Sequence, residues 1–137
     1  FLFVDTRTKV VFSRLIKSES ERAIALDPKQ DVAYYMLGRW NFGVANMNFL
    51  ERGFVKLVYG GLPPASNDEA IKDLRQAIVL APDRIIHHAE LAKVYAATGQ
   101  KNLARQQLEI CAKLKPLDDD DWDAQSEAAK TLAAMKT

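Results

Sequence analysis

The stretch QAIVLAP at residues 76–82 recurs as RAIALDP at residues 22–28 and as ICAKLKP at residues 110–116, and these three stretches decide the fold. Each places small and apolar residues at helical spacing and then ends on a proline. Proline cannot continue a helix, because it has no N–H and its ring clashes with the preceding turn. We therefore interpret each stretch as the end of an amphipathic helix.

The spacing of these prolines indicates a repeat. Pro82 and Pro116 are 34 residues apart, which is the tetratricopeptide period. Pro28 and Pro82 are 54 residues apart, which is one period plus 20 inserted residues. The complete unit places these residues in the packing positions of the pattern: Leu91, Ala92, Tyr95, Gly99, Ala104, Leu108 and Cys111. The sequence therefore predicts an all-α fold, a tetratricopeptide-type helical repeat that forms an α-α superhelix of about seven helices.

We expect a single tetratricopeptide-like repeat domain over residues 1–137. It divides into an incomplete repeat at 1–28, a repeat with an inserted helix at 29–82, a repeat at 83–116 and a C-terminal capping helix at 117–137. Helices are expected at 8–26, 31–45, 48–59, 66–80, 84–98, 102–114 and 121–135. Asp31 is expected to cap the second helix. Ser66 and Glu69 are expected to form a capping box, in which each side chain accepts from the other's backbone N–H.

Composition excludes several classes of protein. The 19 Lys and Arg residues nearly balance the 18 Asp and Glu residues, which argues against a nucleic-acid binder. The one cysteine, Cys111, can form neither an internal disulfide nor a cysteine-based zinc site. No run approaches the roughly 20 apolar residues of a transmembrane helix. Since the first residue is Phe1, we expect the sequence to be part of a longer chain, and its compartment stays open.

Three further segments are more specific than a generic repeat. They are YMLGRW at residues 35–40, FLER at residues 49–52 and GLPPAS at residues 61–66, with Glu69 following. In this order they resemble the regulator of microtubule dynamics family, whose members are tetratricopeptide-like proteins with an insertion inside one repeat. The resemblance implies a protein partner, with tubulin a candidate, because family members associate with microtubules and some with mitochondrial or endoplasmic-reticulum membranes. The run YGGLP at residues 59–63 is equally similar to bacterial repeat proteins, which leaves cytoplasmic and periplasmic locations open.

A concave groove is the candidate binding site, since the first helix of each unit lines that face in repeat proteins. The residues expected to line it are Val32, Tyr35, Arg39, Phe42, Ile86, Ala89, Lys93 and Ala96. This groove would be apolar with two cations, which suits an anionic peptide that has an apolar flank. In the alternative interpretation, Arg39 and Lys93 are solvated or paired with nearby acids.

The inserted segment is the richest in apolar residues. If it is helical, four residues share one face: Leu50, Phe54, Leu57 and Val58. They either pack as core, as apolar stripes usually do, or roof a cavity that holds an acyl chain. A third interpretation is contact with a membrane surface, for which Arg52 and Lys56 supply little positive charge.

No pattern predicts catalysis, a cofactor or a metal site. His87 and His88 are adjacent, and adjacent helical residues point about 100° apart and do not converge on one ion. Cys111 occupies an alanine position, which predicts a small buried residue. The acids at 118–121 lack the glycine and terminal glutamate of a calcium loop, so we assign them to the helix dipole and to solvation.

Two functions are therefore open. The first is a non-enzymatic scaffold that binds a protein or peptide partner in the concave groove. The alternative is binding of a lipid or another apolar small ligand in a cavity closed by the inserted helix at 48–59. The incomplete first repeat would also leave an exposed apolar edge, which predicts dimerisation.

Overall fold

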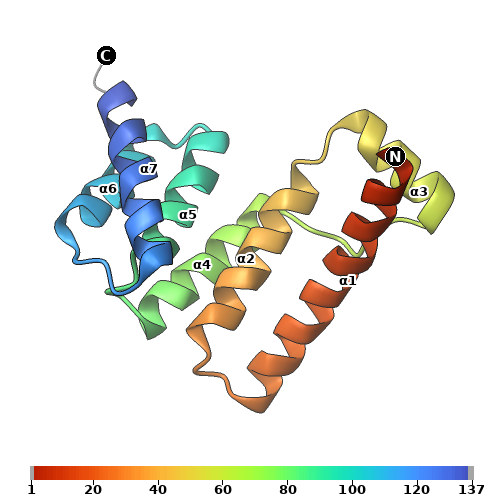
Figure 1. Cartoon of the computed structure of the whole chain (residues 1–137), viewed down its shortest axis with the longest axis horizontal. Helices are drawn as coiled ribbons and strands as arrows, with labels where there is room; N and C mark the ends of the chain where they lie inside the picture. Colours follow the sequence, from red (N-terminus) through yellow and green to blue (C-terminus); the bar gives the residue numbers. More distant parts are fainter. Residues whose placement is uncertain (1, 136–137) are drawn as a thin grey trace.

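The structure is a computed structural model that describes residues 2–135, with side chains described from Arg7 onward. Within that range the chain forms seven α-helices and no strand, which confirms the predicted fold class (Figure 1). The helices are α1 (Leu2–Leu26), α2 (Asp31–Ala45), α3 (Phe49–Tyr59), α4 (Asn67–Leu80), α5 (Ile85–Ala97), α6 (Lys101–Lys113) and α7 (Asp119–Met135).

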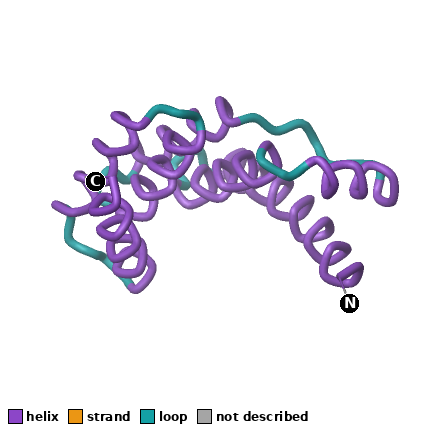
Figure 2. Tube along the Cα trace, turned by 90° about the horizontal axis from the view of Figure 1, so that it is seen from above, coloured by secondary structure: helices purple, strands orange, loops and turns teal. Residues whose placement is uncertain are grey.

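The helices pair as a repeat protein requires. Helix α2 packs mainly against α4, and α5 packs mainly against α6, so each pair is one repeat unit. Helix α1 packs on α2 at one end, and α7 packs on both α5 and α6 at the other. Seen from above, the helices follow a curved path from α1 to α7 (Figure 2). The chain is therefore a short superhelix in which α3 is the only helix outside the stack of the described residues.

The apolar core is centred on α5. One cluster joins it to α4 and α6 through Leu74, Leu91 and Ala104, and a second joins it to α6 and α7 through Leu108 and Ala128. Every residue of α5 from Ile85 to Ala92 is buried. A helix that is buried on all sides occupies a central position, and α5 occupies that position here although it carries His87, His88 and Glu90.

Gly38 sets the closest approach between α2 and α4. A Cβ atom at this position would lie 2.6 Å from Cγ of Leu74 and 3.3 Å from the backbone oxygen of Ala70. No side chain fits there without movement of the neighbouring helix. The glycine of the predicted Leu-Gly pair therefore has a packing role.

The helix ends agree with the sequence in most places. Asn48 caps α3 by accepting from the N–H of Glu51, and Ser66 caps α4 by accepting from the N–H of Glu69. Gly60 and Gly99 end helices in the left-handed conformation, at φ 78° and 79°.

Three details of the predicted helix ends are wrong. Gln30, not Asp31, occupies the N-cap of α2, because the side chain of Asp31 turns towards α5 instead. The capping box is only half formed, since the N–H of Ser66 donates to Oδ1 of Asn41 at 3.4 Å. Helix α1 begins at Leu2 and not at Thr8.

None of the helices in residues 2–135 is both long and apolar enough to span a bilayer.

Candidate functional site

A cavity of about 440 Å³ lies between α5 and α7, and we call it the α5–α7 groove. Its α5 wall consists of residues three or four apart, which share one face of a helix. These residues are Ile86, Ala89, Lys93 and Ala96, with Glu90 and Ala92 beside them. The opposite wall comes from α7 and contains Asp123, Ala124, Glu127, Ala128, Thr131 and Met135. Tyr35 of α2 and Leu108 of α6 complete the lining.

The structure brings together only part of the predicted groove. Tyr35, Ile86, Ala89, Lys93 and Ala96 line the α5–α7 groove. The remaining three predicted residues lie elsewhere. Arg39 lines a separate cavity of about 510 Å³ between α1 and α2, Val32 is exposed, and Phe42 packs against the core.

Glu90 is the charged residue that sequence reasoning missed. It is buried in the wall of the groove, with its carboxylate 3.6 Å from Nε of Arg39 and 3.7 Å from Nζ of Lys93. The two predicted cations therefore share one acid, which agrees with the alternative interpretation of them. Glu90 is eight residues after Pro82 and three before Lys93, so helical spacing could have predicted that its side chain lies beside Lys93. The sequence could not have predicted that Glu90 is buried.

Tyr35 connects α2 to the groove through its ring. The Arg39 guanidinium lies over this ring at 5.5 Å, and the ring of His87 lies 5.3 Å from it. Burial raises the pKa of the Tyr35 hydroxyl, and the nearby charge of Arg39 opposes that shift. The hydroxyl therefore stays protonated at neutral pH and can donate a hydrogen bond to a ligand.

The α7 wall was predicted only as a cap. The large aromatic residue in its first turns, Trp122, does not form this wall, since its side chain is 63% exposed. Two of the residues that face α5 are instead small, namely Ala124 and Ala128, which lie one helical turn apart. Small residues at this spacing allow the close approach of two helices, and that pattern is the signal that would have identified the wall.

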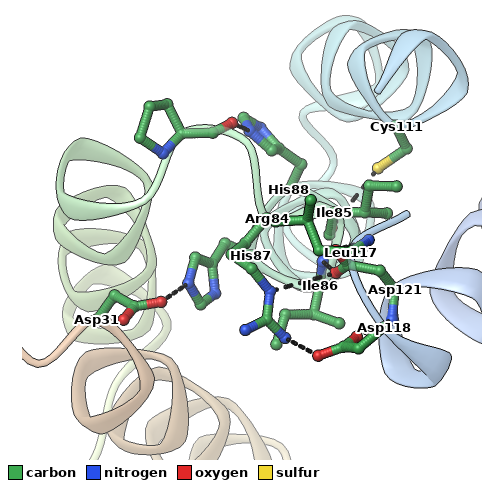
Figure 3. Close-up of polar contacts among 11 residues, drawn as sticks. Asp31, Arg84, Ile85, Ile86, His87, His88, Cys111, Leu117, Asp118 and Asp121 are labelled. Atoms are coloured by element: carbon green, nitrogen blue, oxygen red, sulfur yellow. Dashed lines mark hydrogen bonds and ion pairs between the residues drawn. The ribbon is translucent and has the colours of Figure 1, made fainter. Parts of the chain in front are cut away.

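A polar cluster at the start of α5 positions both walls (Figure 3). The carboxylate of Asp121 is fully buried and accepts from the N–H of Ile86 at 3.0 Å and of Leu117 at 3.1 Å. Arg84 binds Asp118 at 3.0 Å and lies 3.5 Å from Asp121. The prediction that the acids at 118–121 are solvated is thus wrong for Asp121, which joins the first turn of α7 to the first turn of α5.

Both adjacent histidines are structural. Nε2 of His87 lies 2.7 Å from Oδ2 of Asp31, which ties α5 to the start of α2. Burial lowers the pKa of His87 more than Asp31 raises it, so the ring is neutral and donates to the carboxylate. Nε2 of His88 lies 2.8 Å from the backbone oxygen of Pro82, an acceptor, so this nitrogen donates the hydrogen bond.

The described residues contain no group of three or more His, Cys, Asp or Glu side chains that could hold a metal ion. Cys111 is fully buried in the core between α5, α6 and α7, where burial raises the pKa of its thiol to about 12. A thiol with this pKa is not ionised at neutral pH and is a poor nucleophile. Its surroundings match the small buried residue that was predicted.

The inserted helix differs from both main expectations. Leu50, Leu57 and Val58 are exposed at 80%, 86% and 52%, so they neither pack into the core nor enclose a cavity here. Phe54 is half-buried and makes an edge contact with the ring of Tyr59. Periodicity correctly groups the apolar residues on one face, but it does not say which face the rest of the chain covers.

A cavity of about 490 Å³ does lie behind α3, but the predicted roof residues do not line it. Helix α3 faces this cavity with Arg52, Val55 and Lys56. Val55 is buried, and Arg52 donates to the backbone oxygens of Val44 and Ala45. The lipid-cavity alternative therefore loses the side chains on which it depended.

Comparison with known proteins identifies relatives along nearly the whole sequence. The sequence model of the family "Regulator of microtubule dynamics protein 1-3" matches residues 2–136. Regulator of microtubule dynamics protein 3 of Xenopus laevis is 30% identical over 88% of this chain and 26% of its own length. Regulator of microtubule dynamics protein 1 of Caenorhabditis elegans is 28% identical over 75% of this chain and 46% of its own length. The chain thus spans between a quarter and a half of these relatives.

A solved structure resembles the fold. The crystal structure of MamA superposes with a TM-score of 0.54 and 22% sequence identity, covering 84% of this chain and 57% of that chain. This likeness supports the tetratricopeptide-type architecture.

Proposed function

Because this chain belongs to the regulator of microtubule dynamics family, we propose that it is a protein-interaction scaffold that acts in microtubule regulation and holds a partner segment in the α5–α7 groove. The observation that supports this proposal is the groove itself, which has an apolar floor between two helices and charged side chains at its border. A cavity of this kind suits a peptide that inserts apolar side chains and pairs its polar groups at the rim.

The charges of the groove refine the expected partner. The lining contains three acids, Glu90, Asp123 and Glu127, and one cation, Lys93. Arg39 pairs with Glu90. An anionic peptide, expected from the two cations alone, is therefore less favoured than a peptide with a basic residue beside the α7 wall. Complementary charges at such a rim select partners and speed association. The relatives' name points to tubulin or a microtubule-bound protein as the source of this segment.

The test is co-sedimentation of the purified chain with stabilised microtubules, comparing Ala96→Tyr with Ala97→Tyr. Ala96 lines the groove, whereas Ala97 is the next residue and does not line it. Both alanines are exposed, so the new side chains leave the core intact. A tyrosine at position 96 occupies the space of the partner and should weaken binding about tenfold, while position 97 should change it little.

Either of two results would contradict the proposal. Equal affinities for the two variants, with wild-type helicity in each, would remove the groove from the binding site. A wild-type chain that stays in the supernatant at high microtubule concentration would remove the microtubule as the partner.

A further inference from the structure

Glu90 differs from the other two acids that line the α5–α7 groove. Its surface is only 7% exposed, whereas Asp123 and Glu127 are exposed. A carboxylate that is removed from water loses its hydration, which hydrogen bonds normally replace. Within residues 2–135 the contacts of the Glu90 carboxylate are two ion pairs, with Arg39 and Lys93, and it accepts no hydrogen bond. Its hydration is therefore replaced only in part.

The two ion pairs of Glu90 leave one of its oxygens open. Nε of Arg39 at 3.6 Å and Nζ of Lys93 at 3.7 Å both approach Oε1. These distances exceed the range of about 2.7–3.2 Å for an N–H···O hydrogen bond. The two cations are also 53% and 64% exposed, so water weakens both pairs. Oε2 of Glu90 is thus an acceptor in the groove wall that no described side chain or backbone group occupies.

The opposite wall places two more acids at the level of Glu90. Helices α5 and α7 run along the groove from a common start, where Asp121 accepts from the N–H of Ile86. Glu90 is four residues beyond Ile86, whereas Asp123 and Glu127 are two and six residues beyond Asp121. Since each helical residue adds about 1.5 Å along the axis, Glu90 lies between the levels of the two α7 acids.

The floor between these walls consists largely of small side chains. Ala89, Ala92 and Ala96 come from α5, and Ala124 and Ala128 come from α7. Together with the volume of about 440 Å³, these methyl groups leave room for a long side chain. The aliphatic stem of a basic residue packs well on such an apolar surface while its charged end reaches polar partners.

We propose that Glu90 is a specificity-determining residue that selects an arginine of the partner segment. The arginine stem lies over the alanine floor, and its guanidinium donates to Oε2 of Glu90 and to Asp123 or Glu127. This inference rests on the proposed function, because it takes a protein segment to occupy the groove. An acidic side chain at this place would face Glu90 with a like charge and would be rejected.

Arginine suits the site better than lysine for a geometric reason. A guanidinium carries five N–H donors in one plane, so it can reach carboxylates on two walls at once. The ammonium of lysine is a single compact charge that keeps its water more strongly. Acids on both α5 and α7 therefore favour the planar group.

The experiment selects peptides from a random library displayed on phage, with the intact chain and with Glu90→Gln as separate baits. Glutamine keeps the shape of the side chain and removes its charge. The wild-type chain should enrich arginine beside apolar residues, and the variant should lose this enrichment. If Glu90 were only structural, its loss would lower stability without changing which residue is selected. Glu109→Gln is the matched control, since Glu109 is exposed on α6 and does not line the groove.

The affinity of one selected peptide then measures the contact itself. Replacing the peptide arginine by glutamine should raise the Kd of the wild-type chain about tenfold or more, because Glu90 loses its partner. The same peptide change should raise the Kd of Glu90→Gln much less. Circular dichroism and urea unfolding check that the variants are folded. If Glu90→Gln does not fold, Asp123→Asn with Glu127→Gln changes only exposed residues and should also weaken the arginine preference.

Several results would overturn the proposal. They are a wild-type chain that selects no peptide, or that enriches lysine or acids as strongly as arginine; a Glu90→Gln chain that keeps the arginine enrichment; and additive effects of the two substitutions on Kd. Failure of the proposed function would be distinguishable. A chain that selects arginine peptides but does not sediment with microtubules would keep the role of Glu90 and lose only the microtubule as partner.

Discussion

Gly38 is the residue at which the two helices of the split repeat lie closest together. Gly38→Ala should destabilise the chain by about 1–3 kcal/mol, because the new methyl group overlaps the side chain of Leu74. Gly43 lies in the same helix and has nothing within 4 Å of an added Cβ. Gly43→Ala should therefore stabilise by about 0.5–1 kcal/mol. Urea unfolding of both variants measures the difference, and a shift of the same sign in both would contradict this packing role.

Asp73 is a buried carboxyl at the interface of α2 and α4, where it accepts from Nδ2 of Asn41 at 3.1 Å. Burial raises its pKa to about 6, with Glu69 adding to the shift. An acid whose folded pKa is raised costs stability when it is ionised, so its contribution should improve as the pH falls from about 6 towards the unfolded value near 3.9.

Asp73→Asn removes this titration and should raise the free energy of unfolding at pH 7.5 by on the order of 2 kcal/mol, since each pKa unit is worth about 1.4 kcal/mol. The advantage over wild type should shrink as the pH is lowered to about 4.5, which urea unfolding at the two pH values would measure. Asp83→Asn, at an exposed site, is the control and should show no such trend. An advantage that grows on acidification would show that the sign is wrong.

Sequence predicts the individual residues whose role depends on local spacing. Gly99, Ala104 and Cys111 occupy the positions that the repeat pattern assigns to them, because each position has one steric requirement. Asp121 and Glu90 could not be predicted, since their burial depends on partners in other helices. From sequence alone, four consecutive acids are expected to be solvated. The fold shows that one of them, Asp121, is buried.

The exposed and buried faces of helix α3 should respond differently to an introduced charge. Leu57→Asp should leave stability within about 0.5 kcal/mol of wild type, because the side chain is exposed at 86%. Val55→Asp should cost several kcal/mol, on the order of 3, because it buries an unpaired charge between α3 and the stack. Thermal unfolding followed by circular dichroism separates the two. Severe unfolding by Leu57→Asp would restore the original core interpretation.

Sequence predicts the helices better than their placement. The prolines and glycines that end helices act on the few residues beside them. Six of the seven predicted helices therefore agree with the structure to within about two residues at each end. This difference is the normal uncertainty for helix ends. The apolar face of α3 was also predicted, yet the structure turns that face outward. An amphipathic pattern fixes which residues lie together, whereas the covering surface depends on the whole chain.

The whole molecule is a short arc with different chemistry at its two ends. The α5–α7 end offers a groove with acids in its walls, whereas α3 at the other end presents exposed apolar side chains.

Amide hydrogen exchange of the chain, with and without saturating microtubules, would locate the surface that binds the partner. We expect slower exchange in α7 and in the C-terminal half of α5, which border the α5–α7 groove. Exchange in α3 and in the N-terminal half of α1 should be unchanged, because no residue of either segment lines the groove. Protection of α1 and α3 with none in α5 and α7 would remove the α5–α7 groove from the binding site.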